Sequence, residues 1–92
     1  MENTFRASHI LVEKQSQAIA ILEELRKGES FAALAEKHSI CPSRKKGGDL
    51  GEFARGRMVK EFENAVIALK VGETTSVPVK SQFGYHIIKR TK

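Results

Sequence analysis

The sequence predicts one α+β domain in which helices wrap a small, mostly antiparallel sheet. Three observations lead to this fold class. The chain has 92 residues, enough for one core but not for two, so we expect a single domain over residues 1–92. Segments with alternating apolar residues are separated by segments with apolar residues at helical spacing. The last two strand candidates follow each other directly, as they would in a closing hairpin.

The first half of the chain is predicted to form a strand followed by two helices. Phe5–Val12 alternates and is partly apolar on both faces, which indicates a central strand. Apolar residues at helical spacing predict an amphipathic helix over Lys14–Lys27, with Gly28 in the place of a C-terminal cap. Ser30 is a suitable N-cap for a second, shorter helix that ends near Ser39.

The second half supplies a loop, a strand, a helix and two further strands. In order, these are Ser43–Gly48 with one irregular helical turn, Leu50–Phe53, a helix with Met58, Phe62, Val66 and Leu69 on one stripe and Gly72 at its end, Thr75–Val79, and Tyr85–Arg90. Pro78 cannot donate a ladder hydrogen bond, so the strand that contains it is expected at the edge of the sheet.

Composition limits the class of protein but selects no partner. The chain is 40% hydrophobic with a net charge of +5 and a pI near 9.6, which is typical of a soluble globular protein. A single cysteine cannot form an internal disulfide, so we expect a cytoplasmic protein. Neither a secretory signal nor a membrane span is recognisable in the sequence, and no membrane partner is expected.

Two histidines stand in the middle of predicted central strands. A buried, unpaired imidazole is costly, so His9 and His86 are expected to hydrogen-bond to each other across adjacent strands. Such a pair could serve only to set the strand register, or it could take part directly in a site. The residues alone leave both interpretations open.

Other candidate site residues surround the cysteine loop. Cys41 could be a small core residue or a reactive thiol, since it leaves a helix and enters a glycine-bearing loop near several cations. Met58 and Phe62 share a helix face and, at the rim of the domain, would form a soft apolar pocket wall. In a regular strand Phe83 and His86 point to opposite faces, and a bulge at Gly84 would turn Phe83 toward the histidine side.

These pieces together resemble the parvulins, a family of peptidyl-prolyl cis/trans isomerases, and in particular the small stand-alone bacterial members. The resemblance rests on "ASHILV" (7–12), "SICPSRKKGGDLGEF" (39–53), "GRMVKEFENAVIAL" (56–69) and "FGYHIIK" (83–89), which cover nearly the whole chain. It implies a four-stranded antiparallel sheet surrounded by about four helices. It also implies a dyad of His9 and His86 with Cys41 above it, a proline pocket of Leu50, Met58 and Phe62 with Phe83 as a further lining residue, and a supporting hydroxyl at Ser81.

The resemblance further implies rotation about X-Pro bonds in peptides and unfolded proteins, without a metal or other cofactor. We expect the pocket to hold the proline ring and to favour the twisted imide without covalent attack by Cys41. Phosphate-directed parvulins carry a basic loop between the first strand and the first helix, where this chain has only "EKQSQ". Selectivity for phosphorylated substrates is therefore not expected. We also expect the protein to be a monomer.

Three alternatives rank below this interpretation. A thiol hydrolase would combine Cys41 with one histidine but lacks an evident orienting residue. A zinc site could use His38, Cys41 and a sheet histidine but lacks a second close-spaced pair. A binding module, acting as a chaperone or holding nucleic acid through Arg44–Lys46 and the C-terminus, is the third; its cations are not interleaved with aromatic residues.

Overall fold

The computed structural model of the protein describes residues 4–92, and its elements follow the predicted order. They are β1 (Thr4–Val12), α1 (Gln15–Arg26), α2 (Phe31–His38), the 3₁₀ helix η1 (Pro42–Lys46), β2 (Asp49–Ala54), α3 (Lys60–Ala68), β3 (Val79–Ser81) and β4 (Gly84–Arg90). No helix in residues 4–92 is long and apolar enough to cross a bilayer.

The strands form one antiparallel sheet in the order β2-β1-β4-β3. The predicted α+β class and four-stranded antiparallel sheet are therefore confirmed. Around the sheet, the described residues form three α-helices and one 3₁₀ helix. The two central strands are β1 and β4, as their apolar residues on both faces predict.

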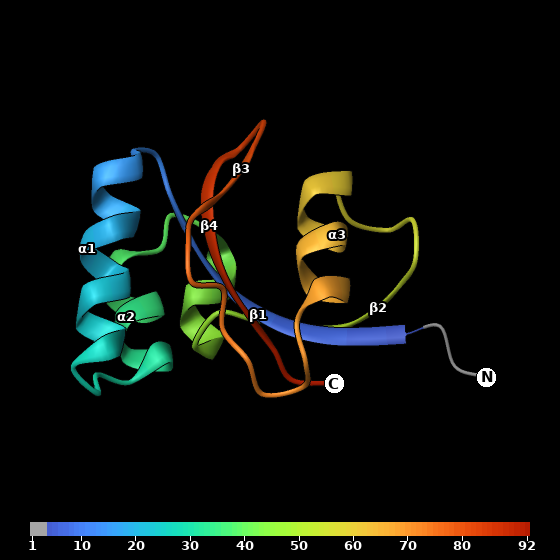
Figure 1. Ribbon diagram of the computed structural model, residues 1–92, viewed down its shortest axis with the longest axis horizontal. Helices are drawn as coiled ribbons and strands as arrows, with labels where there is room; N and C mark the ends of the chain where they lie inside the picture. The colour runs from blue at the N-terminus through green and yellow to red at the C-terminus, as the bar shows by residue number, and fades with distance from the viewer. Residues whose placement is uncertain (1–3) are drawn as a thin grey trace.

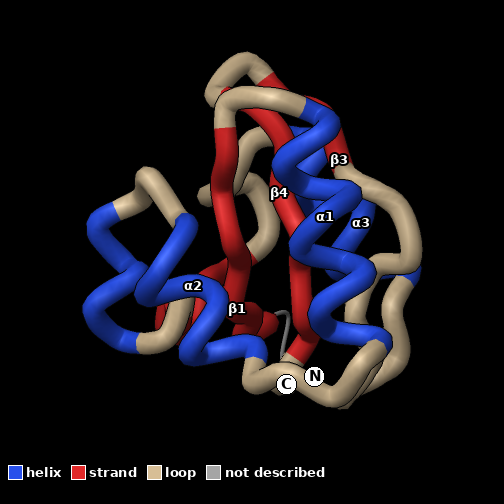
Figure 2. Tube along the Cα trace, turned by 90° about the vertical axis from the view of Figure 1, so that its left-hand side faces the viewer, coloured by secondary structure: helices blue, strands red, loops and turns tan. Residues whose placement is uncertain are grey.

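Helices cover both faces of the sheet, so the core has two halves. In Figure 1, α1 and α2 lie on one side of the strands and α3 on the other; Figure 2 looks onto the side of α1 and α2. One half of the core joins α1 and α2 to the sheet through Ile10, Val12, Ile21, Leu22, Leu34, Ala35 and Ile87. The other half joins α3 to the sheet through Phe5, Ala7, Phe53, Phe62, Val66 and Ile88.

The helix predicted to begin at Met58 begins two residues later. Val59 is the N-cap of α3 and has extended dihedral angles, so Met58 lies outside the helix. The Glu63 carboxylate accepts a hydrogen bond from Gly56 N–H at 2.6 Å, which ties the preceding loop back onto the first turn. At the other end Leu69 is an extended C-cap, so the apolar stripe runs past both ends of the helix.

The predicted edge strand over Thr75–Val79 is also displaced. Its segment does pair with β4, through a bridge between Thr74 and Lys89 and a 2.8 Å hydrogen bond from Thr75 N–H to Ile88 O. Regular pairing resumes only in β3, which starts after Pro78 and forms the edge of the sheet. Proline removes one backbone donor, so the ladder is interrupted where the sequence places it.

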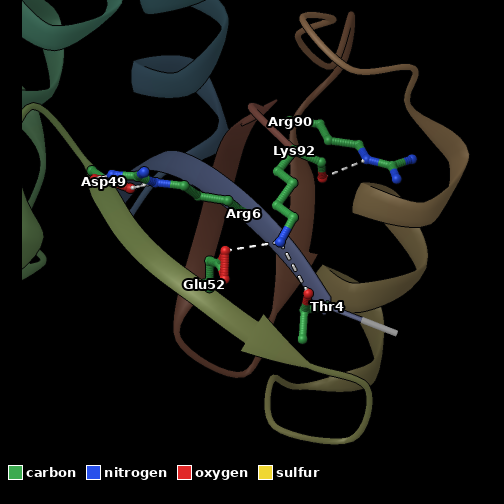
Figure 3. Close-up of polar contacts among 6 residues, drawn as sticks. All are labelled: Thr4, Arg6, Asp49, Glu52, Arg90 and Lys92. Atoms are coloured by element: carbon green, nitrogen blue, oxygen red, sulfur yellow. Dashed lines mark hydrogen bonds and ion pairs between the residues drawn. The ribbon is translucent and has the colours of Figure 1, made fainter. Parts of the chain in front are cut away.

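The last residues of the chain pair with β1 (Figure 3). Thr91 N–H donates to Arg6 O at 2.8 Å, and the Lys92 ammonium contacts Glu52 on β2 at 2.8 Å. Arg6 itself forms an ion pair with Asp49 at 2.5 Å. Exposed ion pairs contribute little to stability, so the backbone hydrogen bond is the more important link.

Candidate active site

The two sheet histidines form the predicted hydrogen-bonded pair. In the register of β1 and β4, His86 lies opposite Leu11 and His9 lies opposite Ile88, so the histidines share one face as diagonal neighbours. Their Nδ1 atoms are 2.9 Å apart and their rings stack with centroids 5.1 Å apart. The predicted hydrogen bond across adjacent strands is thus confirmed.

Ser81 extends this pair into a chain of three polar groups. Its hydroxyl lies 2.6 Å from His86 Nε2 and accepts the Phe83 backbone N–H at 3.2 Å. If Ser81 donates to His86, then His86 donates to His9, and His9 carries its proton on Nε2; reversing both bonds leaves a lone pair on that atom. In either arrangement His9 Nε2, which is buried, lacks a hydrogen-bond partner among residues 4–92.

Burial keeps the dyad neutral. The pKa of His9 is lowered from 6.5 to about 4, chiefly because burial disfavours the charged imidazole and secondarily because of repulsion from His86. Burial also lowers the pKa of His86. At neutral pH the pair is therefore a set of hydrogen-bonding dipoles without net charge.

Phe62 packs against both imidazoles from α3. Its ring meets His9 and His86 edge-on, with centroids 5.6 and 5.5 Å apart. The residue is only 2% exposed, so the prediction that it protrudes at the rim is wrong. It is the floor of the site, because α3 packs directly over the face of the sheet that carries the dyad.

The loop that carries Cys41 is attached to the free edge of β1 beyond its pairing with β2. His9 N–H donates to Gly48 O at 2.9 Å and Ile40 N–H donates to Leu11 O at 2.8 Å. Gly48 has a φ of +89°, and a Cβ there would collide with the carbonyl oxygen of His9. The close approach of this loop to β1 therefore requires glycine at position 48.

Cys41 has the extended conformation that is favoured before a proline, and it is half-buried at the start of η1. Its Sγ accepts a hydrogen bond from the Ser43 hydroxyl at 3.2 Å. Within residues 4–92 the hydrogen-bond partners of the imidazoles are Ser81 and each other, not the thiol. A thiol and imidazole pair of the kind a cysteine hydrolase needs is thus not formed here.

Phe83 reaches the site by a different route from the predicted bulge. Ser81 pairs with Gly84, so Phe83 lies in the turn between β3 and β4 and the alternation of strand residues does not apply to it. The bulge prediction is wrong for this reason. Phe83 is 56% exposed and lines the same cleft as the histidines.

A largely apolar cleft of about 590 Å³ collects these side chains. It brings together the dyad, the cysteine and the pocket residues named from the sequence: His9, Cys41, Leu50, Met58, Phe62, Phe83 and His86. It also includes Leu11, Ile40, Pro42, Arg57 and Val59, which sequence reasoning missed. Leu11 could have been found, because it lies two residues after His9 on the same strand face.

Metal ligation has no support in the described part of the chain. Residues 4–92 contain no group of three or more His, Cys, Asp or Glu side chains placed to hold an ion. His38, the third candidate ligand, is exposed at the end of α2, whereas the sheet histidines are bonded to each other.

Known proteins share both the sequence and the structure of this domain. A family model described as PPIC-type PPIase domain (rotamase) matches residues 9–92. The foldase protein PrsA 4 of Bacillus cereus is 56% identical over 87 residues, which make up 94% of this chain and 31% of that protein. The crystal structure of PrsA from Bacillus subtilis has a TM-score of 0.93 at 48% identity and covers 98% of this chain and 35% of that one.

A match of the full length also exists. The solution structure of NmPin, the parvulin of Nitrosopumilus maritimus, is 54% identical with a TM-score of 0.86, covering 100% of this chain and 99% of that one. The chain thus spans about a third of the length of the PrsA proteins and nearly all of NmPin. It belongs to the PPIC-type PPIase family, the parvulins.

Proposed function

We propose that this chain is a peptidyl-prolyl cis/trans isomerase that accelerates rotation about X-Pro bonds in peptides and unfolded proteins. The observation that carries the proposal is the apolar cleft, which has a neutral histidine pair at its base and Cys41 in its wall. Membership of the PPIC-type PPIase family supports the same reaction.

Isomerisation requires preferential binding of the twisted imide and no formation of a covalent bond. Rotation about the imide disrupts amide resonance, with a barrier of about 18 to 20 kcal/mol. A catalyst needs only to bind the twisted imide better than either planar form. Lowering the barrier by about 5 kcal/mol would accelerate rotation by roughly four orders of magnitude.

The walls of the cleft suit the proline ring. Leu50 and Met58 are partly buried and pack on the core cluster that contains Phe62, so they are apolar surfaces already held in place. A pyrrolidine ring placed against them would be fixed while the residue before it rotates. Removal of water from the imide also disfavours the charge-separated resonance form and so favours the twisted state.

The polar groups at the bottom of the cleft are preorganised. The side-chain hydrogen bonds that link Ser81 to His86 and His86 to His9 are buried, and the imidazoles are neutral. These groups therefore present fixed dipoles that resist reorganisation. Cys41 contributes a polar sulfur near the imide without forming a bond to the carbonyl carbon. This part of the proposal is supported by the hydrogen bond that the Ser43 hydroxyl donates to Cys41 Sγ and by the absence of an imidazole partner for the thiol among the described residues.

We further propose that phosphorylation of the substrate is not required. The connection from β1 to α1 consists of Glu13 and Lys14 alone, so it offers no cluster of cations at that point. We also propose that the protein is a monomer and that it is located in the cytoplasm. Light scattering of the purified chain and fractionation of the cells that make it would test them.

The activity is tested by NMR exchange measurements of cis/trans interconversion in a proline tetrapeptide. We expect Cys41→Asp to retain substantial activity, because a polar or anionic group is what the position requires. Met58→Ala should lose at least about tenfold in kcat/KM, since burying a side chain of this size is worth roughly 1.5 to 3 kcal/mol. Met58→Ala combined with Phe62→Ala should lose most of the activity.

Folding controls accompany these variants because Phe62 is also a core residue. Ile19→Ala removes a 46% exposed apolar side chain from α1, on the other side of the sheet, and serves as the matched control for Met58→Ala. An inactive but folded Cys41→Asp would favour covalent attack by sulfur. A wild-type protein that fails to accelerate exchange in any proline peptide would refute the proposed function.

A further inference from the structure

A second hollow, of about 540 Å³, adjoins the cleft and shares Ile40, Cys41 and Pro42 with it. The remainder of its lining is polar and basic: Lys37, His38, Ser39, Arg44 and Lys45. The two basic segments come from the end of α2 and from η1, which the short connection around Cys41 brings together. The hollow is therefore a cationic extension of an apolar cleft.

Within residues 4–92, Lys37, Arg44 and Lys45 form no ion pair with a carboxylate. Among the described residues, no Asp or Glu lines either the hollow or the cleft, and the cleft adds the cation of Arg57. Positive charges held together in a concave surface raise the local potential and favour an anionic ligand.

The position of the hollow indicates what that anion belongs to. An extended peptide advances about 3.3 Å per residue, so a side chain near the proline can reach a hollow that begins at Cys41. Ile40 lies on the boundary between the two and is 53% exposed, which leaves an apolar surface for the residue in between.

We propose that this hollow is a subsite that binds an acidic side chain of the substrate peptide, one or two residues away from the proline. The inference rests on the proposed isomerase function and adds a substrate preference to it. Arg44 and Lys45 are the principal determinants, since both are exposed cations on η1 directly after the Cys41-Pro42 corner. Lys37 contributes from α2.

The test is a peptide series measured by NMR exchange. Each peptide has one central proline in an alanine background. Glutamate is placed in turn at each of the two positions before and the two positions after the proline, and peptides with alanine or lysine at the same position are the references. We expect glutamate at one of these positions to raise kcat/KM roughly fivefold over alanine, and lysine there to lower it. The advantage should shrink as salt increases from about 0.05 M to about 0.5 M, because exposed charges are screened.

Two variants assign the preference to the hollow. Arg44→Ala with Lys45→Ala should bring the ratio of kcat/KM for glutamate and alanine peptides close to one. Arg44→Glu with Lys45→Glu should invert the order, so that the lysine peptide becomes the better substrate. Lys70→Ala with Lys80→Ala removes the same charge from exposed positions outside both hollows and should leave the ratio unchanged.

Several results would overturn this assignment while leaving the proposed function intact. Equal isomerisation of all peptides would refute the proposed subsite. If no peptide were isomerised, the proposed isomerase function itself would be refuted. If the kcat/KM of a phosphoserine peptide exceeded that of the glutamate peptide by more than about tenfold, the ligand of the hollow would be a phosphate group and not a carboxylate. DNA binding that depends on Arg44 and Lys45, together with an unchanged peptide ratio, would assign the cations to nucleic acid instead.

Discussion

Acidification should destabilise this domain through His9, and the size of the effect follows from its burial. The pKa of His9 is about 4 in the folded chain, against 6.5 for an ordinary exposed imidazole. Between these pH values the unfolded chain binds a proton that the folded chain rejects, so stability rises with pH across this window. The contribution is complete above about pH 6.5, is lost as the pH falls, and levels off below about pH 4.

The magnitude can be worked from the same two values. The whole difference corresponds to about 3 kcal/mol, since one pKa unit is worth about 1.4 kcal/mol. Between about pH 7.5 and pH 4.5 the linkage relation gives a loss of about 2.5 kcal/mol in the free energy of unfolding. With a urea m-value of about 1 to 1.5 kcal/mol/M, the midpoint should move down by roughly 2 M.

Urea unfolding followed by far-ultraviolet circular dichroism at constant ionic strength measures this shift. The control is His9→Asn, which keeps a hydrogen-bonding side chain beside His86 but cannot titrate. The pKa of His86 is also lowered by burial, so the variant should retain part of the pH dependence and lose the part that belongs to His9. Identical pH dependence in the wild type and in His9→Asn would refute the argument that a buried neutral His9 couples to folding.

Two further predictions concern the supports of the site. Gly48→Ala should cost at least about 2 kcal/mol more than Gly51→Ala in urea unfolding, because both glycines have positive φ but only Gly48 faces the His9 carbonyl; equal costs would show that the close approach is not limiting. Ser81→Ala should cost about 1 to 3 kcal/mol by leaving His86 Nε2 unpaired, whereas Ser81→Thr keeps the hydroxyl and should cost less; a Thr variant no better than Ala would contradict this role of the hydroxyl.

The sequence determined the elements and the faces they present. Alternation in β1 places Phe5 and Ala7 on one face and Ile10 and Val12 on the other, and these two pairs belong to the two separate halves of the observed core. Helical spacing identified the long helices for the same reason, because side-chain direction repeats with the backbone period. The prediction that the strand near Pro78 lies at the edge of the sheet was also correct, although that strand begins only after the proline.

The candidate site was predictable in membership but not in arrangement. From the residues alone, the expected hydrogen bond of His9 with His86 needed only the rule that buried polar groups are paired. Met58 and Phe83 were also candidates from the residues, whereas Leu50 came only from the resemblance of its motif to the parvulins, and all three line the cleft. Local periodicity misplaced Met58 on the helix.

What only the tertiary structure decided is how distant segments meet. Backbone hydrogen bonds from His9 to Gly48 and from Ile40 to Leu11 set the height of the cysteine loop over the sheet, and no local pattern encodes them. The same contacts place Arg44 and Lys45 beside the cleft. From the sequence alone these two cations could not be distinguished from other solvated surface charges. Local sequence specifies direction within an element, whereas the packing of elements far apart in the chain specifies distance between them.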